Sequence, residues 1–405
     1  MATSTPGFRT LSPALQRFFA ATVINMIGSG ALFGFVLIYF HEVRHIPLGQ
    51  AGLAVGAMSF MVVLCTPVAG FLSDRFGARK VLTMGCVVSI VAGGLFVVVD
   101  SFAAAVATSA LLGLGNALWF PAQSALLSLI VQPHERPTVS AFQRVALNIG
   151  AALGGAFGGF LVRDNSLRSF QLLFAINVAT YLVFLSVLPA LPSGRVAAAA
   201  QRGGPGFRDV LRDRFFVMLL GTDVAVGLGF GFLFAFMPVY ASSLGIDKGT
   251  IGLLFMLGAV AVTVTQVPVL RAARGRQRMN ALALMNIWFV AAFALMALTP
   301  QMAVGTAVVA IAVAQVLGGF GESVMGAVRQ PLTSDLAPPE LVGRYFGLAA
   351  MVFQGCMGLA NAIGGAVMDH SRRAVWLIPL VASVAGVVGS LALRRRIPAP
   401  IALSA

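Results

Sequence analysis

Gly-Phe-Leu-Ser-Asp-Arg-Phe-Gly-Ala-Arg-Lys, residues 70–80, lies between two long apolar runs and is nearly the only charged interruption between them. Gly77 permits a tight turn because it has no Cβ, and Gly70 would let the end of one helix lie close to a neighbour. Arg79 and Lys80 form a basic pair before the second run. A connection this short makes the flanking helices antiparallel neighbours. The stretch therefore predicts a charged hairpin loop at a membrane surface.

The composition places the whole chain in a membrane. Of its 405 residues, 59% are hydrophobic and only 10% are charged, with a mean hydropathy of +0.93, whereas soluble domains carry about 25% charge. A span needs about 20 apolar residues, and each must be a helix that satisfies its own backbone hydrogen bonds. We therefore predict an all-α polytopic membrane protein. The twelve expected transmembrane helices lie at about 16–40, 49–72, 81–99, 102–130, 138–161, 170–191, 215–240, 250–270, 279–299, 302–328, 344–367 and 374–393.

Basic residues are unevenly distributed between the two faces of the predicted bundle. The chain carries 27 Lys and Arg against 13 Asp and Glu, a formal net charge of +14. With a cytoplasmic N-terminus, the basic residues on the outer side are Arg44, Arg163, Arg168, Lys248, Arg372 and Arg373. This asymmetry predicts a multi-pass protein of the cell membrane with both termini in the cytoplasm. The basic face should attract membrane lipids with anionic headgroups, and no basic stripe with interleaved aromatic residues indicates nucleic-acid binding.

The longest break between spans divides the chain into two halves. Residues 192–214 are rich in Ala, Gly and Arg and leave six spans on each side. We expect a cytoplasmic N-terminal tail at 1–13, a six-helix bundle at 14–191, a cytoplasmic central loop at 192–214, a second six-helix bundle at 215–393 and a cytoplasmic C-terminal tail at 394–405.

An internal repeat supports this division. One constant offset lays residues 109–159 on residues 315–365. The matched positions include Gly113 with Gly319, Gly115 with Gly321, Pro133 with Pro339, Gly158 with Gly364 and Gly159 with Gly365. Two pseudo-symmetric bundles related by an axis along the membrane normal would place a binding site between them, near the midplane.

Residues 70–80 resemble the signature between the second and third helices of the major facilitator superfamily, Gly-x-x-x-Asp-Arg-x-Gly-x-(Arg/Lys)-(Arg/Lys). The positions that fit it are Gly70, Asp74, Arg75, Gly77, Arg79 and Lys80. Residues 148–159 are similar to the glycine-rich fifth-helix motif of the drug/proton antiporter branch, with Gly155 in place of that motif's proline. The resemblance implies two halves that rock about a central cavity. It also assigns the six signature residues to a cytoplasmic gating motif.

Two of the 13 acidic residues, Asp223 and Glu322, fall inside predicted spans. A charge at the bilayer centre costs at least about 2.5 kcal/mol, so such residues usually face a cavity and are functional. We therefore predict Asp223 and Glu322 as proton-coupling residues. The alternatives are that Glu322 is a structural carboxylate paired with Arg329, and that Asp223 extends to the cytoplasmic interface.

Polar residues mark the faces of several predicted helices. Gln315, Glu322 and Arg329 lie seven apart, which is two helical turns, and would share one face. Asn116 and Gln123 are spaced in the same way in the first half. The predicted cavity residues are Asn25, Asn116, Gln123, Arg144, Asn148, Gln315, Arg329 and Gln354.

The residues that usually carry catalysis or metals show no suitable pattern. The three cysteines, Cys65, Cys86 and Cys356, lie in predicted spans and are best interpreted as small buried hydrophobic residues. The four histidines lie in loops without metal-ligand spacing, and we find no phosphate loop or nucleophile elbow. We therefore expect no metal, no cofactor and no enzymatic activity.

Together these features predict a secondary active transporter, functional as a monomer, whose partners are a small-molecule substrate, protons and membrane lipids. The expected activity is proton-coupled export of a small, partly hydrophobic drug or metabolite. An uncoupled facilitator or nutrient importer of the same fold is the alternative. A membrane-embedded receptor or enzyme is a more remote one.

Overall fold

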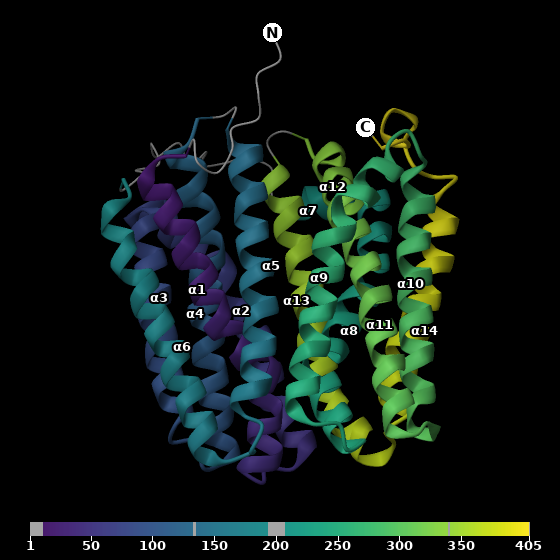
Figure 1. Ribbon diagram of the computed structural model, residues 1–405. Coiled ribbons are helices and arrows are strands. Elements are labelled where there is room, and N and C mark those ends of the chain that lie inside the picture. The colour runs from purple at the N-terminus through teal and green to yellow at the C-terminus, as the bar shows by residue number, and fades with distance from the viewer. Residues whose placement is uncertain (1–10, 133–134, 193–206, 339–340, 405) are drawn as a thin grey trace. The chain divides into compact units, whose positions relative to one another are not determined.

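The computed structural model describes residues 11–132, 135–192, 207–338 and 341–404. Within these residues, twelve helices are long and apolar enough to cross a membrane, which confirms the predicted number of spans and the all-α fold class. Figure 1 labels the elements along the chain.

The helices group into two compact units. Unit 1 comprises Met1–Pro47, Ala57–Ala200 and Lys248–Met256. Unit 2 comprises Leu48–Gly56, Gln201–Asp247 and Leu257–Ala405. The start of helix α2 (Leu48–Phe76) thus belongs to unit 2, and the start of helix α9 (Lys248–Ala273) belongs to unit 1.

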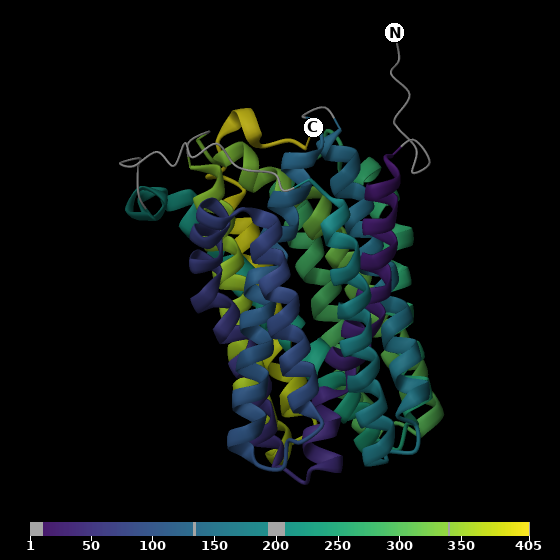
Figure 2. The same ribbon diagram turned by 90° about the vertical axis from the view of Figure 1, so that its left-hand side faces the viewer.

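The helices of the first half of the chain are α1 (Pro13–Ile38), extended by the π-helical turn η2 (Tyr39–Val43), α2 (Leu48–Phe76), α3 (Ala78–Phe96), α4 (Phe102–Ile130), α5 (Arg136–Leu161) and α6 (Leu167–Val187), extended by the 3-10 turn η3 (Leu188–Ala190). Figure 2 shows α3 and α4 from their side, in blue, as antiparallel neighbours joined by a short loop.

The second half begins with the short helix α7 (Phe207–Arg212) and continues with α8 (Arg214–Ser243), α9 (Lys248–Ala273), α10 (Arg278–Leu298) with η4 (Thr299–Gln301), and α11 (Val304–Val324). The π-helical turn η5 (Met325–Arg329) joins α11 to α12 (Gln330–Leu336). The chain ends with α13 (Val342–His370), α14 (Ala374–Leu393) and the 3-10 turn η6 (Ala399–Ile401).

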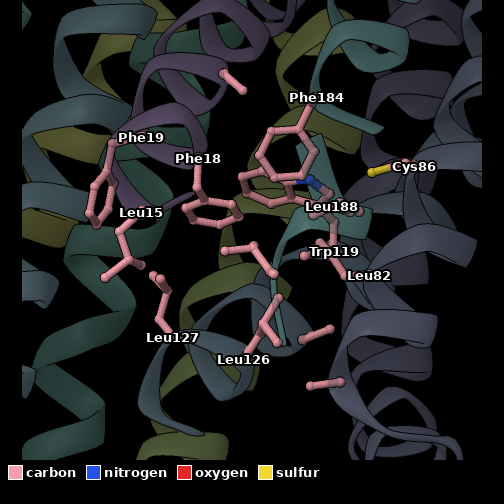
Figure 3. Close-up of a cluster of buried hydrophobic side chains, with 14 of the residues drawn as sticks. Leu15, Phe18, Phe19, Leu82, Cys86, Trp119, Leu126, Leu127, Phe184 and Leu188 are labelled. Carbon is pink, nitrogen blue, oxygen red and sulfur yellow. The ribbon is translucent and has the colours of Figure 1, made fainter. Parts of the chain in front are cut away.

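A cluster of buried hydrophobic side chains, three large aromatic rings among them, packs α1, α4 and α6 together in unit 1 (Figure 3). Trp119 of α4 lies 5.6 Å from Phe184 of α6, and Phe18 of α1 lies 5.4 Å from Phe184, measured between ring centroids. All three side chains are buried. Burying such large rings away from polar surroundings, with tilted contacts between them, fixes three helices against one another.

The turn between α2 and α3 forms as the sequence predicts at Gly77. This residue ends α2 with φ of +89°, in the left-handed region that glycine adopts without strain. Arg79 then donates from Nη1 to the Leu191 carbonyl oxygen at 2.7 Å and so ties α3 to the end of η3. Arg75 and Lys80 are exposed, and the Asp74 side chain lies outside the described part of the chain.

Gly70 differs from the expectation of close packing. A Cβ added at this position would meet no atom within 4 Å. The end of α2 therefore does not need a glycine at Gly70 for packing against a neighbour in this structure.

Glycines at repeat-related positions make equivalent contacts. A Cβ at Gly113 of α4 would lie 2.3 Å from the Met58 carbonyl oxygen of α2, and one at Gly319 of α11 would lie 2.8 Å from Ala261 of α9. Real Cβ atoms do not come this close. In each half, the fourth span therefore packs backbone to backbone against the second span.

The same holds for the second glycine pair of the repeat. Gly159 of α5 lies against the start of α9, where its Cβ would be 2.3 Å from the Lys248 carbonyl oxygen. Gly365 of α13 lies against the start of α2, where its Cβ would be 2.1 Å from the Leu48 carbonyl oxygen. Lys248 also forms an ion pair with Glu42 at 2.9 Å. Because of these contacts, the first residues of α9 group with unit 1 and the first residues of α2 group with unit 2.

The glycine contacts give a direct test of the packing. In Gly113→Ala the new methyl group would clash with the backbone of α2, and overpacking of this kind destabilises by about 1–3 kcal/mol. We expect a lower melting temperature for purified Gly113→Ala in detergent, measured by tryptophan fluorescence. The matched control is Gly94→Ala in α3, where a Cβ meets nothing within 4 Å. The control should melt at the same temperature as the parent or higher. Equal melting of both variants would contradict the packing.

Candidate functional site

The central feature of unit 2 is a buried ion pair that joins two membrane-spanning segments. Asp223 of α8 is 8% exposed, and Arg329 at the end of η5 is 5% exposed. Arg329 Nε donates to Asp223 Oδ1 at 2.7 Å, and Arg329 Nη2 donates to Asp223 Oδ2. This is the bidentate geometry in which a planar guanidinium matches a carboxylate, and it is among the strongest polar contacts in proteins.

Thr333 of α12 completes the arrangement. Its hydroxyl accepts a hydrogen bond from Arg329 Nη1 and donates to the Arg329 carbonyl oxygen at 3.0 Å. Thr333 is buried, one helical turn beyond Arg329. The sequence prediction did not include Thr333, although its spacing of four residues from Arg329 was a signal that could have found it.

A π-helical turn places Arg329. The prediction that Gln315, Glu322 and Arg329 form one stripe assumed continuous α-helical spacing. Met325–Arg329 instead form a π-helix, which adds a residue to the turn and moves the residues after it around the helix axis. This geometric premise was therefore wrong, and Arg329 meets Asp223 of α8. Turns of this kind often occur at functional sites.

Aromatic rings pack together farther along α8. Phe230 is two turns beyond Asp223 on α8, and its ring lies 5.5 Å from Phe353 of α13 and 6.1 Å from Phe289 of α10. Between them, a Cβ at Gly227 would lie 2.8 Å from Cys356. A cluster of packed aromatic rings thus lies about 10 Å along α8 from the ion pair.

Glu322, the other predicted coupling residue, lies on α11 before the π-helical turn and is half-buried. Its neighbour Ser323 is buried and lies 2.7 Å from the Thr265 hydroxyl of α9. The end of α11 is therefore tied to α9 just beside Glu322.

Unit 1 holds a network of uncharged polar side chains. Gln123 of α4 is fully buried, donates to the Thr22 hydroxyl of α1 at 3.4 Å and accepts from Gln143 of α5 at 3.1 Å. Asn25, one turn from Thr22, is 0% exposed, and neither polar atom of its amide has a hydrogen-bond partner in the described part of the chain. The predicted candidates Asn25 and Gln123 thus lie inside unit 1. Thr22 and Gln143 were missed by the prediction.

The remaining predicted cavity residues are distributed over both units. Asn116 of α4 is buried, and Arg144 and Asn148 of α5 are half-buried. In unit 2, Gln315 of α11 is buried against Gly258 of α9, and Gln354 of α13 is half-buried. Among the predicted charged candidates, Asp223 and Arg329 are brought into direct contact. The described residues contain no group of three or more His, Cys, Asp and Glu side chains suited to a metal ion.

Comparison with known proteins extends these findings. The chain is 26% identical over 371 residues to the uncharacterized MFS-type transporter YqjV of Bacillus subtilis, covering 88% of this chain and 86% of that protein. It is 22% identical over 370 residues to the multidrug resistance protein MdtH of Cronobacter sakazakii, covering 91% of this chain and 89% of that protein.

The structure is similar to a solved structure of the nucleoside transporter NupG, with a TM-score of 0.79 at 12% identity, over 94% of this chain and 99% of that chain. At this identity the likeness concerns the fold alone. The family model of the Major Facilitator Superfamily matches residues 18–309 and 224–404. This match takes in all twelve spanning helices, and the chain is a multi-pass membrane transporter, not an enzyme, that belongs to the Major Facilitator Superfamily.

Proposed function

We propose that this transporter exports a small, partly hydrophobic compound in exchange for protons, and that the buried Asp223–Arg329 ion pair is the proton-coupling element. The observation that carries the proposal is a bidentate ion pair enclosed within two membrane-spanning helices. Intramembrane ionisable residues of this kind mark ion pathways and proton relays in transporters. The similarity to a protein named for multidrug resistance supports the direction and the substrate class.

The geometry offers a simple coupling mechanism. Proton uptake by Asp223 would remove its negative charge and leave Arg329 without a counter-ion in a region of low dielectric. A buried charge that loses its partner is strongly disfavoured, so the helices carrying the pair would have to rearrange. Proton release would restore the carboxylate and the bidentate contact. The equilibrium between two conformations thereby becomes linked to proton occupancy.

The substrate would bind beside this pair. The aromatic cluster around Phe230 supplies apolar contact area, and the polarizable Cys356 lies at its edge. A partly hydrophobic compound that binds beside the intact ion pair and stabilises it would lower the affinity of Asp223 for a proton. Competition of this kind produces exchange rather than co-transport, because substrate and proton each favour release of the other.

The remaining proposals concern the transporter's oligomeric state, its membrane, its orientation and its cytoplasmic gate. We propose that it functions as a monomer in the cell membrane with both termini in the cytoplasm, as the distribution of basic residues predicts. Residues 70–80 would then gate the cytoplasmic side. The hydrogen bond from Arg79 to the Leu191 carbonyl oxygen supports this proposal, because it already joins two helix ends on this side.

Transport in proteoliposomes tests the coupling. With an imposed pH gradient and a panel of fluorescent lipophilic compounds, we expect the parent protein to release protons when a transported compound is added. Asp223→Asn should lose this proton signal because it removes the titrating group. Since the variant also leaves Arg329 without its counter-ion, downhill movement of the compound is measured in the same vesicles and shows that the variant is folded and active. Asp100→Asn, which removes an exposed carboxylate, is the matched control and should couple normally.

The outcomes separate the two predicted coupling residues and the alternative function. A proton signal that survives in Asp223→Asn and disappears in Glu322→Gln would move the coupling role to Glu322. Downhill movement of the compound without any proton signal in the parent protein would contradict antiport. It would identify a facilitator or importer instead.

The ion pair also predicts how the stability of the folded protein changes when one or both charges are removed. Asp223→Ala leaves Arg329 buried without its carboxylate and should destabilise the protein by about 3–5 kcal/mol. Asp223→Ala/Arg329→Leu removes both charges and should recover most of this loss, since a buried ion pair and an apolar pair of similar volume are often close in free energy. Melting temperatures in detergent measure both variants. A double variant that melts no higher than Asp223→Ala would show that Arg329 is not paired with Asp223 in the protein.

A further inference from the structure

The chain end of unit 2 is tied back onto the loop between α9 and α10. We call Ala399–Ser404 the tail strap. Ser404 N donates to the Arg276 carbonyl oxygen at 2.9 Å, and Gly275 N donates to the Ser404 carbonyl oxygen at 2.8 Å. Arg278 N donates to the Ala402 carbonyl oxygen at 2.9 Å. These bonds form two isolated β-bridges, and Figure 1 shows the strap, in yellow, beside the start of α10.

The strap contacts the loop through backbone hydrogen bonds, which do not involve the loop's arginine side chains. Gly275 has φ of +68°, so the loop turns sharply between Arg274 and Arg276. Both arginines are exposed. Arg278, in contrast, is buried and forms an ion pair with Asp335 of α12 at 2.6 Å. The loop is therefore held by the strap and by Arg278, while Arg274 and Arg276 remain available.

These two arginines belong to a larger cationic surface. Arg271, at the end of α9, and Arg394 and Arg395, just after α14, are exposed as well. Because α10 packs between α11 and α14, the end of α14 lies at the same end of unit 2 as the start of α10. None of these five arginines forms an ion pair with a carboxylate in the parts of the chain that the structure describes.

The cationic surface lies at the depth of lipid headgroups. The spanning segment of α9 ends at Ala273, that of α10 begins at Arg278, and that of α14 ends at Leu393. The arginines therefore begin within a few residues of the edge of the hydrocarbon. At this level they would meet phosphate groups, and each cation near an anionic surface adds to the attraction.

An exposed leucine adds an apolar contact to the same surface. Leu403 of the tail strap is 57% exposed and pairs through its backbone with Gln277, between Arg276 and Arg278. An apolar side chain beside cationic side chains is the combination that binds to membrane interfaces, where the leucine enters the acyl boundary and the cations meet headgroups.

We propose that the cationic surface formed by Arg271, Arg274, Arg276, Arg394 and Arg395, with Leu403 of the tail strap, is a docking site for anionic phospholipid headgroups. Charge complementarity, membrane depth and the exposed apolar residue together identify this occupant. The strap gives the site a fixed shape, since it holds the loop by backbone bonds that do not involve the arginine side chains. The proposal requires only that the chain crosses a membrane, and it does not depend on proton coupling.

Lipid binding to the full-length protein tests the site. Phosphatidylglycerol and phosphatidylcholine are added separately to the purified protein in detergent, and native mass spectrometry measures the apparent Kd of each. We expect Arg274→Gln/Arg276→Gln to weaken phosphatidylglycerol binding on the order of tenfold or more and to leave phosphatidylcholine binding unchanged. Leu403→Asn should weaken the binding of both lipids.

The matched control is Arg372→Gln/Arg373→Gln, which removes the same charge from exposed positions at the opposite end of α14. It should bind phosphatidylglycerol like the parent protein. Equal weakening in the control and the test variant would show a general effect of net charge and overturn the proposal, as would unchanged binding in the test variant. If Arg274→Gln/Arg276→Gln fails to fold, Arg394→Gln/Arg395→Gln should show the same loss.

Discussion

A charge that is removed from water inside a bilayer has to find a counter-ion within the protein, and in this chain that requirement is met by the contact between Asp223 and Arg329. Several features of unit 2 serve the contact. The π-helical turn brings Arg329 to α8, Thr333 holds the guanidinium from the far side, and both charges are nearly excluded from solvent. A pair assembled with this much support is stable when both charges are present and unstable when one is neutralised.

Within each unit, close contacts at glycines join the helices into rigid bodies. Gly319 lets α11 approach α9, and Gly113 lets α4 approach α2. Glycines at the other repeat-related positions hold the first residues of α2 and α9 against α13 and α5. Helices packed in this way move as units rather than deforming gradually. Under the proposed coupling, a change of protonation at Asp223 would therefore move whole helices of unit 2.

Much of the fold follows from the sequence because hydropathy and backbone chemistry decide it. Apolar runs of spanning length must be helices in a bilayer, and Gly77 marks a turn that needs a positive φ. The repeat of glycines was also informative, since Gly113, Gly159 and Gly365 each mark a close approach to another helix's backbone. Gly70 was an exception: it matches the family signature, yet a Cβ there meets no atom within 4 Å.

The candidate site was harder to predict than the fold. The sequence identified Asp223 and Arg329 separately because charges are rare in the spans, but their contact depends on a π-helical turn that breaks the heptad spacing. Thr22 and Gln143 carry no charge and were not distinguished from other polar residues, although they hold Gln123. The tail strap depends on backbone hydrogen bonds between segments far apart in the chain, which side-chain patterns do not encode.

Proton uptake by Asp223 during the transport cycle can be observed directly. Infrared difference spectroscopy of the purified protein with isotopically labelled aspartate, recorded between high and low pH, detects the carbonyl stretch of protonated carboxyl groups. We expect one component of the labelled band to be lost in Asp223→Asn, while the components from the other aspartates remain. A labelled spectrum that is unchanged in that variant over the pH range in which transport changes would show that Asp223 stays ionised and does not carry the proton.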